Sequence, residues 1–226
     1  MANADDLYVK NLFSPGHTAA WEYLSGYEYP WQALAGIRNF IMELGAALST
    51  SEYERIGDDI WIHCSAGIAP SAHIGNAVII GPNAEIRHCA FIRGSVLVGE
   101  NAVIGNSTEV KNSIIFDGVQ APHFTYIGDS ILGYKSHMGA GSITSNIKSD
   151  KTSISVAVGN ERIDTGMRKF GSVLGDYAEI GCNTVLNPGC IIGAHTTIYP
   201  LSMVRGLVPS RSIYKKRGEV VKKYDT

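Results

Sequence analysis

The sequence lacks any apolar run that approaches the roughly 18 residues a membrane-spanning helix requires. Its first residues, Met1–Asp6, include acidic side chains where a secretory signal would be basic and then apolar. Charge of one sign is also missing, because 19 basic side chains face 21 acidic ones and the formal net charge is −2. A chain so balanced has no general attraction for nucleic acid. These absences predict a cytoplasmic protein without a membrane span or a nucleic-acid partner.

Cysteine is also scarce in this chain. The four cysteines, Cys64, Cys89, Cys182 and Cys190, are scattered, and no two of them have C-x-x-C spacing. In a chain of 226 residues, long enough to build a core without covalent links, this pattern predicts reduced thiols. We expect no disulfide and no metal site.

The main feature of the sequence is a six-residue repeat. A period of six fits neither an α-helix nor an ordinary half-buried strand, and it is typical of a parallel β-helix in which three units make one triangular coil. We therefore predict an all-β fold, a left-handed parallel β-helix of hexapeptide repeats over residues 56–208. The apolar residue of each unit should point into a shared interior. In the first part of the repeat these residues are Ile56, Ile62, Ile68, Ile74, Ile80, Ile86, Ile92, Val98, Ile104, Val110 and Phe116.

Residues 1–55 do not carry the repeat, and we predict that they form an aromatic and helical N-terminal cap. Apolar residues at spacings of three and four from Leu34 to Leu48 predict an amphipathic helix that begins after Pro30. We expect the preceding aromatic residues to pack this helix onto the first coil and to cover its open edge, which would otherwise promote aggregation. A sugar- or partner-binding aromatic platform is the alternative.

The repeat breaks at Pro122, where an apolar residue is due, and it stays irregular until Asn146. The break leaves His123 off the pattern. Departures from a local rule persist most often where function requires them. We therefore expect a functional site at this break.

Residues 145–173 form an excursion from the coil. Two short runs around Gly159-Asn160, Ser153–Val158 and Glu161–Asp164, predict a β-hairpin arm. We expect the arm to pack on a neighbouring subunit. The repeat returns in phase from Leu174 to Val204. Residues 209–226 form a basic tail, which we interpret as solvated or, alternatively, as a clamp for a polyanion.

Two motifs resemble a known enzyme family. The segments H-x-T-Y-x-G-D, His123–Asp129, and G-A-G-x-I-T-x-N, Gly139–Asn146, are similar to the acetyltransferase half of the bacterial bifunctional enzymes that acetylate glucosamine-1-phosphate and then uridylylate it. The later run Thr165–Gly189 resembles the archaeal sugar-1-phosphate enzymes that join the same two activities. The resemblance covers about residues 56–208. It implies a homotrimeric, acetyl-CoA-dependent N-acetyltransferase for an amino-sugar phosphate in nucleotide-sugar and cell-envelope biosynthesis.

The resemblance also implies which residues contact the acceptor. It places the general base at His123, and histidine has the side chain whose unperturbed pKa suits proton exchange with an amine near neutral pH. Arg93 and Lys111 match positions that hold the sugar phosphate, and their equivalent places in adjacent coils predict a paired cationic clamp. The remaining acceptor contacts it implies are Tyr126, Asn146 and a loop lysine, either Lys148 or Lys151.

For acetyl-CoA, the resemblance implies a groove between neighbouring subunits. The backbone N–H at Ala140 would lie near the thioester carbonyl, where negative charge develops during attack. Cys182 and Pro200 fall where the family has small cofactor-contacting residues, and Arg205 lies one place from its arginine for the CoA phosphates.

Two departures separate this chain from the family pattern. His137 stands where the family has asparagine in N-x-G-A-G, so we expect His137 to be an altered acceptor contact or a wall residue. A glycine-rich nucleotide loop and an α/β domain before the coils are also missing, so we expect any uridylyl transfer to come from a separate nucleotidylyltransferase.

Two other functions compete with acetyl transfer. The first is a non-catalytic β-helix that assembles or regulates a separate sugar nucleotidylyltransferase. The second is a zinc carbonic anhydrase of the hexapeptide type, which needs three converging histidines. His123 with His137 or His88 could supply them, but their spacing does not match known ligand patterns.

Overall fold

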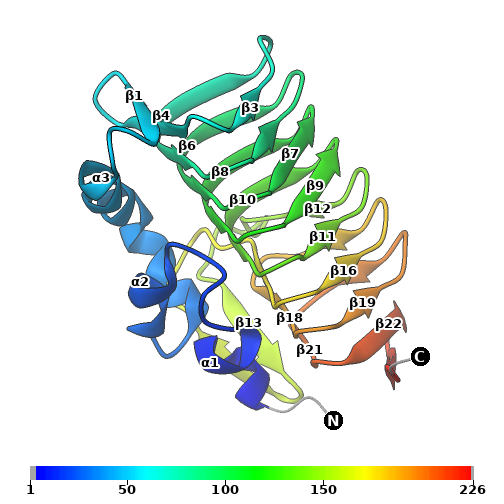
Figure 1. Cartoon of the computed structure of the whole chain (residues 1–226). Coiled ribbons are helices and arrows are strands. Elements are labelled where there is room, and N and C mark those ends of the chain that lie inside the picture. Colours follow the sequence, from blue (N-terminus) through cyan, green and yellow to red (C-terminus); the bar gives the residue numbers. More distant parts are fainter. Residues whose placement is uncertain (1–3, 225–226) are drawn as a thin grey trace.

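The computed structural model describes residues 4–224, which form a parallel β-helix with a short helical segment along one side (Figure 1). This helical segment precedes the first strand and contains two 3₁₀-helices and three α-helices. They are η1 (Ala4–Leu7), α1 (Val9–Leu12), α2 (Trp21–Ser25), η2 (Pro30–Gly36) and α3 (Ile37–Ala47).

Two sheets wrap around the coil. The larger sheet folds over two of the three sides and contains β1 (Tyr53–Ile56), β2 (Ile60–His63), β4 (His73–Ile80), β6 (Phe91–Val98), β8 (Glu109–Ile115), β10 (Tyr126–Leu132), β12 (Ile143–Thr144), β15 (Ser172–Leu174), β17 (Val185–Leu186), β18 (Cys190–Ile192), β20 (Met203–Val204) and β21 (Leu207–Val208). The smaller sheet forms the third side and contains β3 (Gly67–Ile68), β5 (Glu85–Ile86), β7 (Val103–Asn106), β9 (Gln120–His123), β11 (His137–Met138), β16 (Glu179–Ile180), β19 (Thr197–Ile198), β22 (Ser212–Lys216) and β23 (Glu219–Lys222). The predicted β-helix is therefore confirmed.

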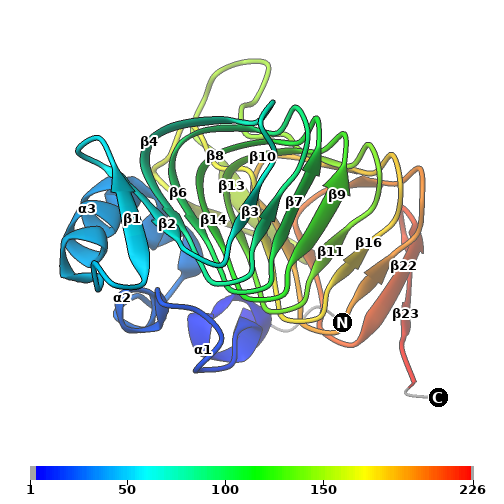
Figure 2. The same ribbon diagram turned by 45° about the horizontal axis from the view of Figure 1, so that its top comes forward.

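The coils stack on one another (Figure 2), and this stacking buries the apolar ladder. From Ile80 to Val110 the predicted inward residues are at most 1% exposed, and from Leu174 to Val204 at most 2%. The first coil differs, because Ile62, Ile68 and Ile74 have a coil on one side only and are half-buried. Ile56 is 45% exposed and belongs to β1, which pairs antiparallel with β2. Ile56 therefore precedes the first parallel strand of the coil.

The register changes earlier than the sequence indicates. Ile92 pairs with Val110, but Gly94 pairs with Lys111, so one residue is missing from the coil directly after Val110. From there Ile115 takes the inward place opposite Val98. The predicted break at Pro122 is wrong in position, since the inward place there belongs to Ala121, opposite Ile104.

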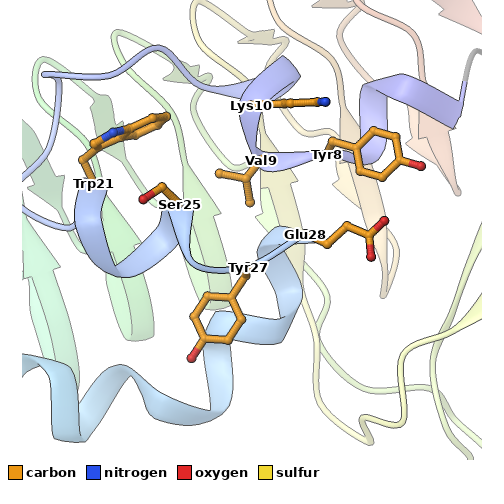
Figure 3. A pocket seen from close by; sticks show the side chains of 7 residues that line it. All are labelled: Tyr8, Val9, Lys10, Trp21, Ser25, Tyr27 and Glu28. Carbon is orange, nitrogen blue, oxygen red and sulfur yellow. The ribbon is translucent and has the colours of Figure 1, made fainter.

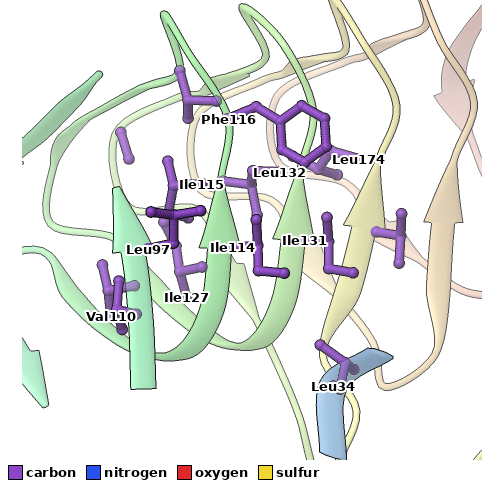
Figure 4. Packing of buried hydrophobic residues seen from close by; sticks show 14 of the residues in the cluster. Leu34, Leu97, Val110, Ile114, Ile115, Phe116, Ile127, Ile131, Leu132 and Leu174 are labelled. Atoms are coloured by element: carbon purple, nitrogen blue, oxygen red, sulfur yellow. The ribbon is translucent and has the colours of Figure 1, made fainter. Parts of the chain in front are cut away.

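A second apolar ladder points outward on one side of the coil. It is fully or almost fully buried, at most 2% exposed, because the N-terminal segment covers it (Figure 4). Helix α3 packs on β4, β6 and β8, and η2 packs on β10. The members of this outward ladder are Ile79, Leu97, Ile114, Ile131, Val173 and Ile191. Because the N-terminal segment covers this outward face, both faces of these strands are buried, and their sequences are continuous apolar runs.

The N-terminal segment runs along the coil instead of closing its end (Figure 1). The backbone N–H of Ser14 donates to Asp176, and the hydroxyl of Ser210 donates to Asp6, so the segment starts beside the last coils. It reaches the first coils only at α3, where Gly45 packs on Trp61. The predicted helix over the first coil is confirmed, with its first turns as the 3₁₀-helix η2, but the predicted cover of the open edge is wrong.

The predicted hairpin arm is present as β13 (Ser155–Val158) and β14 (Glu161–Asp164), paired antiparallel around Gly159 and Asn160. Its packing differs from the expectation. Ile154 and Val156 are fully buried against the chain's own coil, where the arm lies over β21 and Gly206. The arm therefore needs no neighbouring subunit to bury this face.

The basic tail is also part of the coil. Strand β22 pairs parallel with β19, and β23 folds back antiparallel on β22. This hairpin covers the last coil, and Tyr214 packs inside it, 7% exposed. The tail therefore forms a β-hairpin on the last coil, while its basic side chains Lys215, Lys216, Arg217 and Lys222 are exposed to solvent as predicted. None of the helices described has the length and apolar character to cross a membrane.

Candidate functional site

One corner of the coil lines up four of the predicted site residues. Each lies just before a residue in the left-handed conformation. Backbone hydrogen bonds at this corner join each coil to the next. The N–H of Gly141 donates to His123, that of Asn183 donates to Ala140, and that of Leu201 donates to Cys182. We call this column, His88, Asn106, His123, Ala140, Cys182 and Pro200, the His123 corner. Register alone therefore places the predicted base and three predicted cofactor contacts in successive coils.

His123 is exposed at this corner, at the end of β9. Its carbonyl accepts hydrogen bonds from Gly141 and from the hydroxyl of Thr125, which hold the backbone. Its imidazole has no hydrogen-bond partner within residues 4–224. The ring is therefore available to contact a bound molecule.

The backbone N–H of Ala140 likewise donates no hydrogen bond in the described part of the chain. Its neighbours Gly139 and Gly141 both donate to adjacent coils, so the peptide at Ala140 is held while its N–H stays available. A fixed N–H of this kind can stabilise negative charge on an oxygen.

The next corner along β10 gathers the predicted acceptor contacts. The positive-φ residues Ala77, Ser95, Asn112 and Asp129 form this Asp129 corner. Arg93 and Lys111 come just before it in adjacent coils, but each is already ion-paired. Arg93 lies 2.9 Å from Glu109, and the Nζ of Lys111 lies 3.2 Å from Asp129. Lys111 lies opposite Gly94, and Arg93 has no counterpart in the next coil, so the two cations do not occupy equivalent places as predicted; each instead has a carboxylate partner from the next coil.

Tyr126 and Asn146 belong to the same cluster. Burial raises the pKa of Tyr126, and the carboxylates of Asp129 and Glu109 raise it further, while Arg93 and a hydrogen bond from Asn146 oppose the shift. The amide of Asn146 also donates to Asp129. The structure therefore brings Arg93, Lys111, Tyr126 and Asn146 into one cluster.

Asp129 is a residue that sequence reasoning missed. Its carboxylate accepts from Lys111, Asn112 and Asn146 at once, and its side chain is only 6% exposed. The signal was present, because Asp129 is the last residue of H-x-T-Y-x-G-D. No role could be assigned to it without knowing which donors the register places around it.

His137 lies on the other side of the His123 corner. It is an outward residue of β11, and its Nδ1 lies 3.1 Å from Glu179 in the next coil. It therefore does not join Tyr126 and Asn146 within one chain.

The loop lysines and Arg205 lie beside the hairpin arm. Lys148 folds back onto its own loop and donates to the carbonyl of Ser153, whereas Lys151 is exposed in a left-handed conformation. Lys148, Arg162 and Arg205 line one pocket of about 380 Å³ between the arm and the coil, with Asp150 as its acidic residue. Arg205 is therefore on the side of the Asp129 corner, away from Cys182 and Pro200.

A separate pocket of about 480 Å³ lies in the N-terminal segment, between α1 and α2 (Figure 3). Trp21, Tyr27 and Tyr8 line it together with Lys10 and Glu28. It contains none of the predicted site residues. Among residues 4–224, no three histidine, cysteine or acidic side chains are placed to hold a metal ion.

Fold and site together define a hexapeptide-repeat β-helix with an aligned corner and a charged cluster beside it. The model of the bacterial transferase hexapeptide (six repeats) matches residues 55–88. The model of the GMPPB C-terminal domain matches residues 83–199, more than half of the chain. The chain belongs to this GMPPB C-terminal domain family.

Curated relatives match a part of the same region. A bifunctional sugar-1-phosphate nucleotidylyltransferase/acetyltransferase from Sulfurisphaera tokodaii is 38% identical over 95 residues, 42% of this chain and 24% of the relative. A bifunctional protein GlmU from Methanococcus aeolicus is 33% identical over 112 residues, 50% of this chain and 27% of the relative. The match therefore spans about a quarter of the length of these relatives.

Solved structures with similar coils include two acetyltransferases. The acetyltransferase domain of PglB from Neisseria gonorrhoeae, in complex with acetyl coenzyme A, has 17% identity and a TM-score of 0.27, over 78% of this chain and 61% of that one. GDP-perosamine N-acetyl transferase from Caulobacter crescentus, in complex with CoA and GDP-perosamine, has 18% identity and a TM-score of 0.30, over 74% and 57%.

Proposed function

We propose that this protein transfers an acetyl group from acetyl-CoA to the amine of an amino-sugar phosphate such as glucosamine-1-phosphate, in cytoplasmic nucleotide-sugar biosynthesis. The observation that carries the proposal is the His123 corner, where an unpartnered imidazole and the unpartnered N–H of Ala140 stand in adjacent coils. The names of the bifunctional relatives, which include an acetyltransferase, support the same chemistry.

His123 acts as the general base in this mechanism. The acceptor amine is mostly protonated near neutral pH, so it first loses one proton to solvent; His123 then takes a second proton from the nitrogen as it attacks the thioester carbonyl. The N–H of Ala140 stabilises the oxyanion that forms. The C–N bond is made, the C–S bond breaks, and the proton passes from His123 to the leaving CoA thiolate.

The donor and acceptor occupy neighbouring features of the coil. Acetyl-CoA extends from Ala140 along Cys182 and Pro200, both of which are exposed, whereas Arg205 lies in the pocket beside the arm and is left out of the cofactor site. The sugar phosphate lies against Tyr126 and Asn146, with Arg93, Lys111 and a loop lysine as its cationic contacts. His137 faces this site from a neighbouring subunit.

A homotrimer completes the site in this proposal. Phe124 and Leu201, next to the His123 corner, are 63% and 80% exposed, and Met203 is 47% exposed. Large apolar side chains gathered at one edge are typical of a surface that another chain covers. A second copy packed here would enclose the groove along the corner.

The test is a coupled assay that detects free CoA with a thiol reagent. Acetyl-CoA is supplied with a panel that includes glucosamine-1-phosphate and galactosamine-1-phosphate. We expect CoA release with one acceptor, and a loss of about a hundredfold or more for His123→Ala. His88→Ala, from the same corner two coils earlier, is the matched control and should keep its rate. Absence of CoA release across the panel, or turnover of His123→Ala within about threefold of the wild type, would refute the proposal.

One observation favours a non-catalytic role as the second candidate. Arg93 and Lys111 are both neutralised by carboxylates, which is also what a purely structural charge network would show. In that case the β-helix would assemble with a separate sugar nucleotidylyltransferase. Calorimetry with acetyl-CoA distinguishes the two functions, because the non-catalytic role predicts that acetyl-CoA does not bind.

A further inference from the structure

Asp129 lies in the cluster of Arg93, Lys111, Tyr126 and Asn146, and its carboxylate is contacted by three donor side chains. One of its oxygens lies 3.2 Å from the Nζ of Lys111 and also accepts from the amide of Asn146, while the other accepts from Asn112 at 2.9 Å. The residue is only 4% exposed. A buried carboxylate is stable only when such donors surround it, so these four side chains hold one another in place.

The carboxylate is not required by the corner itself. Asp129 has a φ of 50°, a conformation that asparagine, aspartate and glycine tolerate best. The equivalent places in the three preceding coils hold Asn112, Ser95 and Ala77, with φ of 45°, 54° and 53°. The corner therefore forms with neutral residues, and the charge of Asp129 needs another explanation.

Asp129 also lies at the base of the hairpin arm. Asn146 is the last residue before the chain leaves the coil, and Gly171 is where the chain returns. The carbonyl of Asp129 accepts from the N–H of Gly171, and the carbonyl of Asn146 accepts from the N–H of Phe170. Through its side chain and its backbone, Asp129 therefore contacts both ends of the excursion that carries Lys148.

We propose that Asp129 is the positioning residue of the acceptor site, which holds the ammonium of Lys111 and the amide of Asn146 in fixed places and joins them to the base of the hairpin arm. The inference rests on the proposed function for its acceptor. An ammonium has three N–H donors, so a contact with Asp129 orients Lys111 and leaves donors for a phosphate. The amide of Asn146, fixed in the same way, also donates a hydrogen bond to Tyr126.

The test compares Asp129→Asn with Glu85→Gln. Asparagine suits the left-handed corner and keeps one oxygen, so the substitution removes the charge with little change of shape. Glu85 forms an exposed ion pair with Arg87 on another side of the coil and provides the control. We expect Asp129→Asn to raise the KM of the amino-sugar phosphate by at least about tenfold, because small displacements of positioning groups are costly. The KM of acetyl-CoA should stay within about twofold in both variants.

An exchange variant separates positioning from simple loss of stability. Asp129→Asn combined with Asn146→Asp restores one carboxylate and one amide in contact, with the hydrogen bond reversed. We expect it to recover part of the lost affinity for the acceptor. A KM for the acceptor that is unchanged in Asp129→Asn, or a fall in active protein with no change in KM, overturns the inference.

Hydrogen exchange gives a readout that does not depend on acetyl transfer. Amides of residues 147–169 should exchange at least about fivefold faster in Asp129→Asn, and at the wild-type rate in Glu85→Gln, because the base of the arm has lost an anchor. If the wild type transfers no acetyl group but the arm shows this change, the proposed function has failed and the anchoring stands. Unchanged exchange overturns the anchoring itself.

Discussion

The backbone N–H of Ser14 donates to the carboxylate of Asp176 at 2.7 Å, although 162 positions separate the two residues. The N–H of Asp176 in turn donates to the carbonyl of Leu12, so hydrogen bonds run in both directions between Asp176 and this stretch of the N-terminal segment. Asp176 also accepts from the N–H of Tyr134. This carboxylate therefore joins the N-terminal segment to the later coils, and the segment in turn keeps the outward apolar ladder from water.

Asp176 should make the stability depend on pH. Burial raises its pKa above the ordinary 3.8, although the N–H groups of Ser14 and Tyr134 oppose the shift. The folded state therefore binds this proton more tightly than the unfolded chain, and the contribution of Asp176 to stability decreases as the pH rises from about 3.8 through the raised folded pKa. The difference in free energy of unfolding between wild type and Asp176→Asn, measured by urea titration, should fall across this window and be constant above it. An NMR titration that places this pKa below 3.8 would contradict the prediction.

The outward ladder should contribute as much stability as the inward one. Ile114 is fully buried between β8 and the N-terminal segment, so Ile114→Ala removes buried methyl groups and leaves a cavity. We expect a loss of about 2–5 kcal/mol in the free energy of unfolding, measured with denaturant. Ile56→Ala is the control, because Ile56 is 45% exposed on β1 and lies outside the proposed contact between copies. A loss below about 1 kcal/mol for Ile114→Ala would mean that the segment is not packed on the coil.

The pair of Lys111 and Asp129 should behave as a buried ion pair. Lys111→Met leaves the carboxylate of Asp129 with two amide donors and no cation, which should cost about 3 kcal/mol of unfolding free energy. The double variant Lys111→Met with Asp129→Asn removes both charges and should recover most of that loss. Arg87→Met, which breaks the exposed pair with Glu85, should cost at most about 1 kcal/mol. Equal losses in the single and double variants would show that charge is not the cause.

The exposed apolar residues at the His123 corner should control assembly. Leu201 is 80% exposed, and Leu201→Glu would place a charge in the proposed contact between copies. We expect sedimentation velocity to show a trimer for the wild type and mainly monomer for Leu201→Glu, because a buried unpaired charge is costly. Ile56→Glu, at a residue that is 45% exposed on β1, should leave the trimer intact. A monomeric wild type refutes the proposed trimer.

The six-residue periodicity predicted most of the coil, because whether a residue points inward depends on its spacing from its near neighbours in the sequence. Every sixth residue must be apolar if three short strands are to enclose a dry interior, and this rule holds from Ile80 to Val110 and again from Leu174 to Val204. It failed where one residue is missing after Val110, because Val110 and Phe116 keep the spacing of six in the sequence. The slip is visible only in pairing, since Phe116 leaves the ladder and packs against Phe13.

The sequence by itself determined the repeat, the hairpin arm and the motif residues from His123 to Asn146, because these depend on spacing and on local turn chemistry. Only the tertiary structure decided which residues meet. Stacking places His123, Ala140, Cys182 and Pro200 in one column, and it surrounds Asp129 with donors from three different segments. Stacking also places the N-terminal segment along the coil, through Asp6 and Asp176. These contacts join residues far apart in the chain, and their partners depend on the register of whole coils, which no local pattern contains.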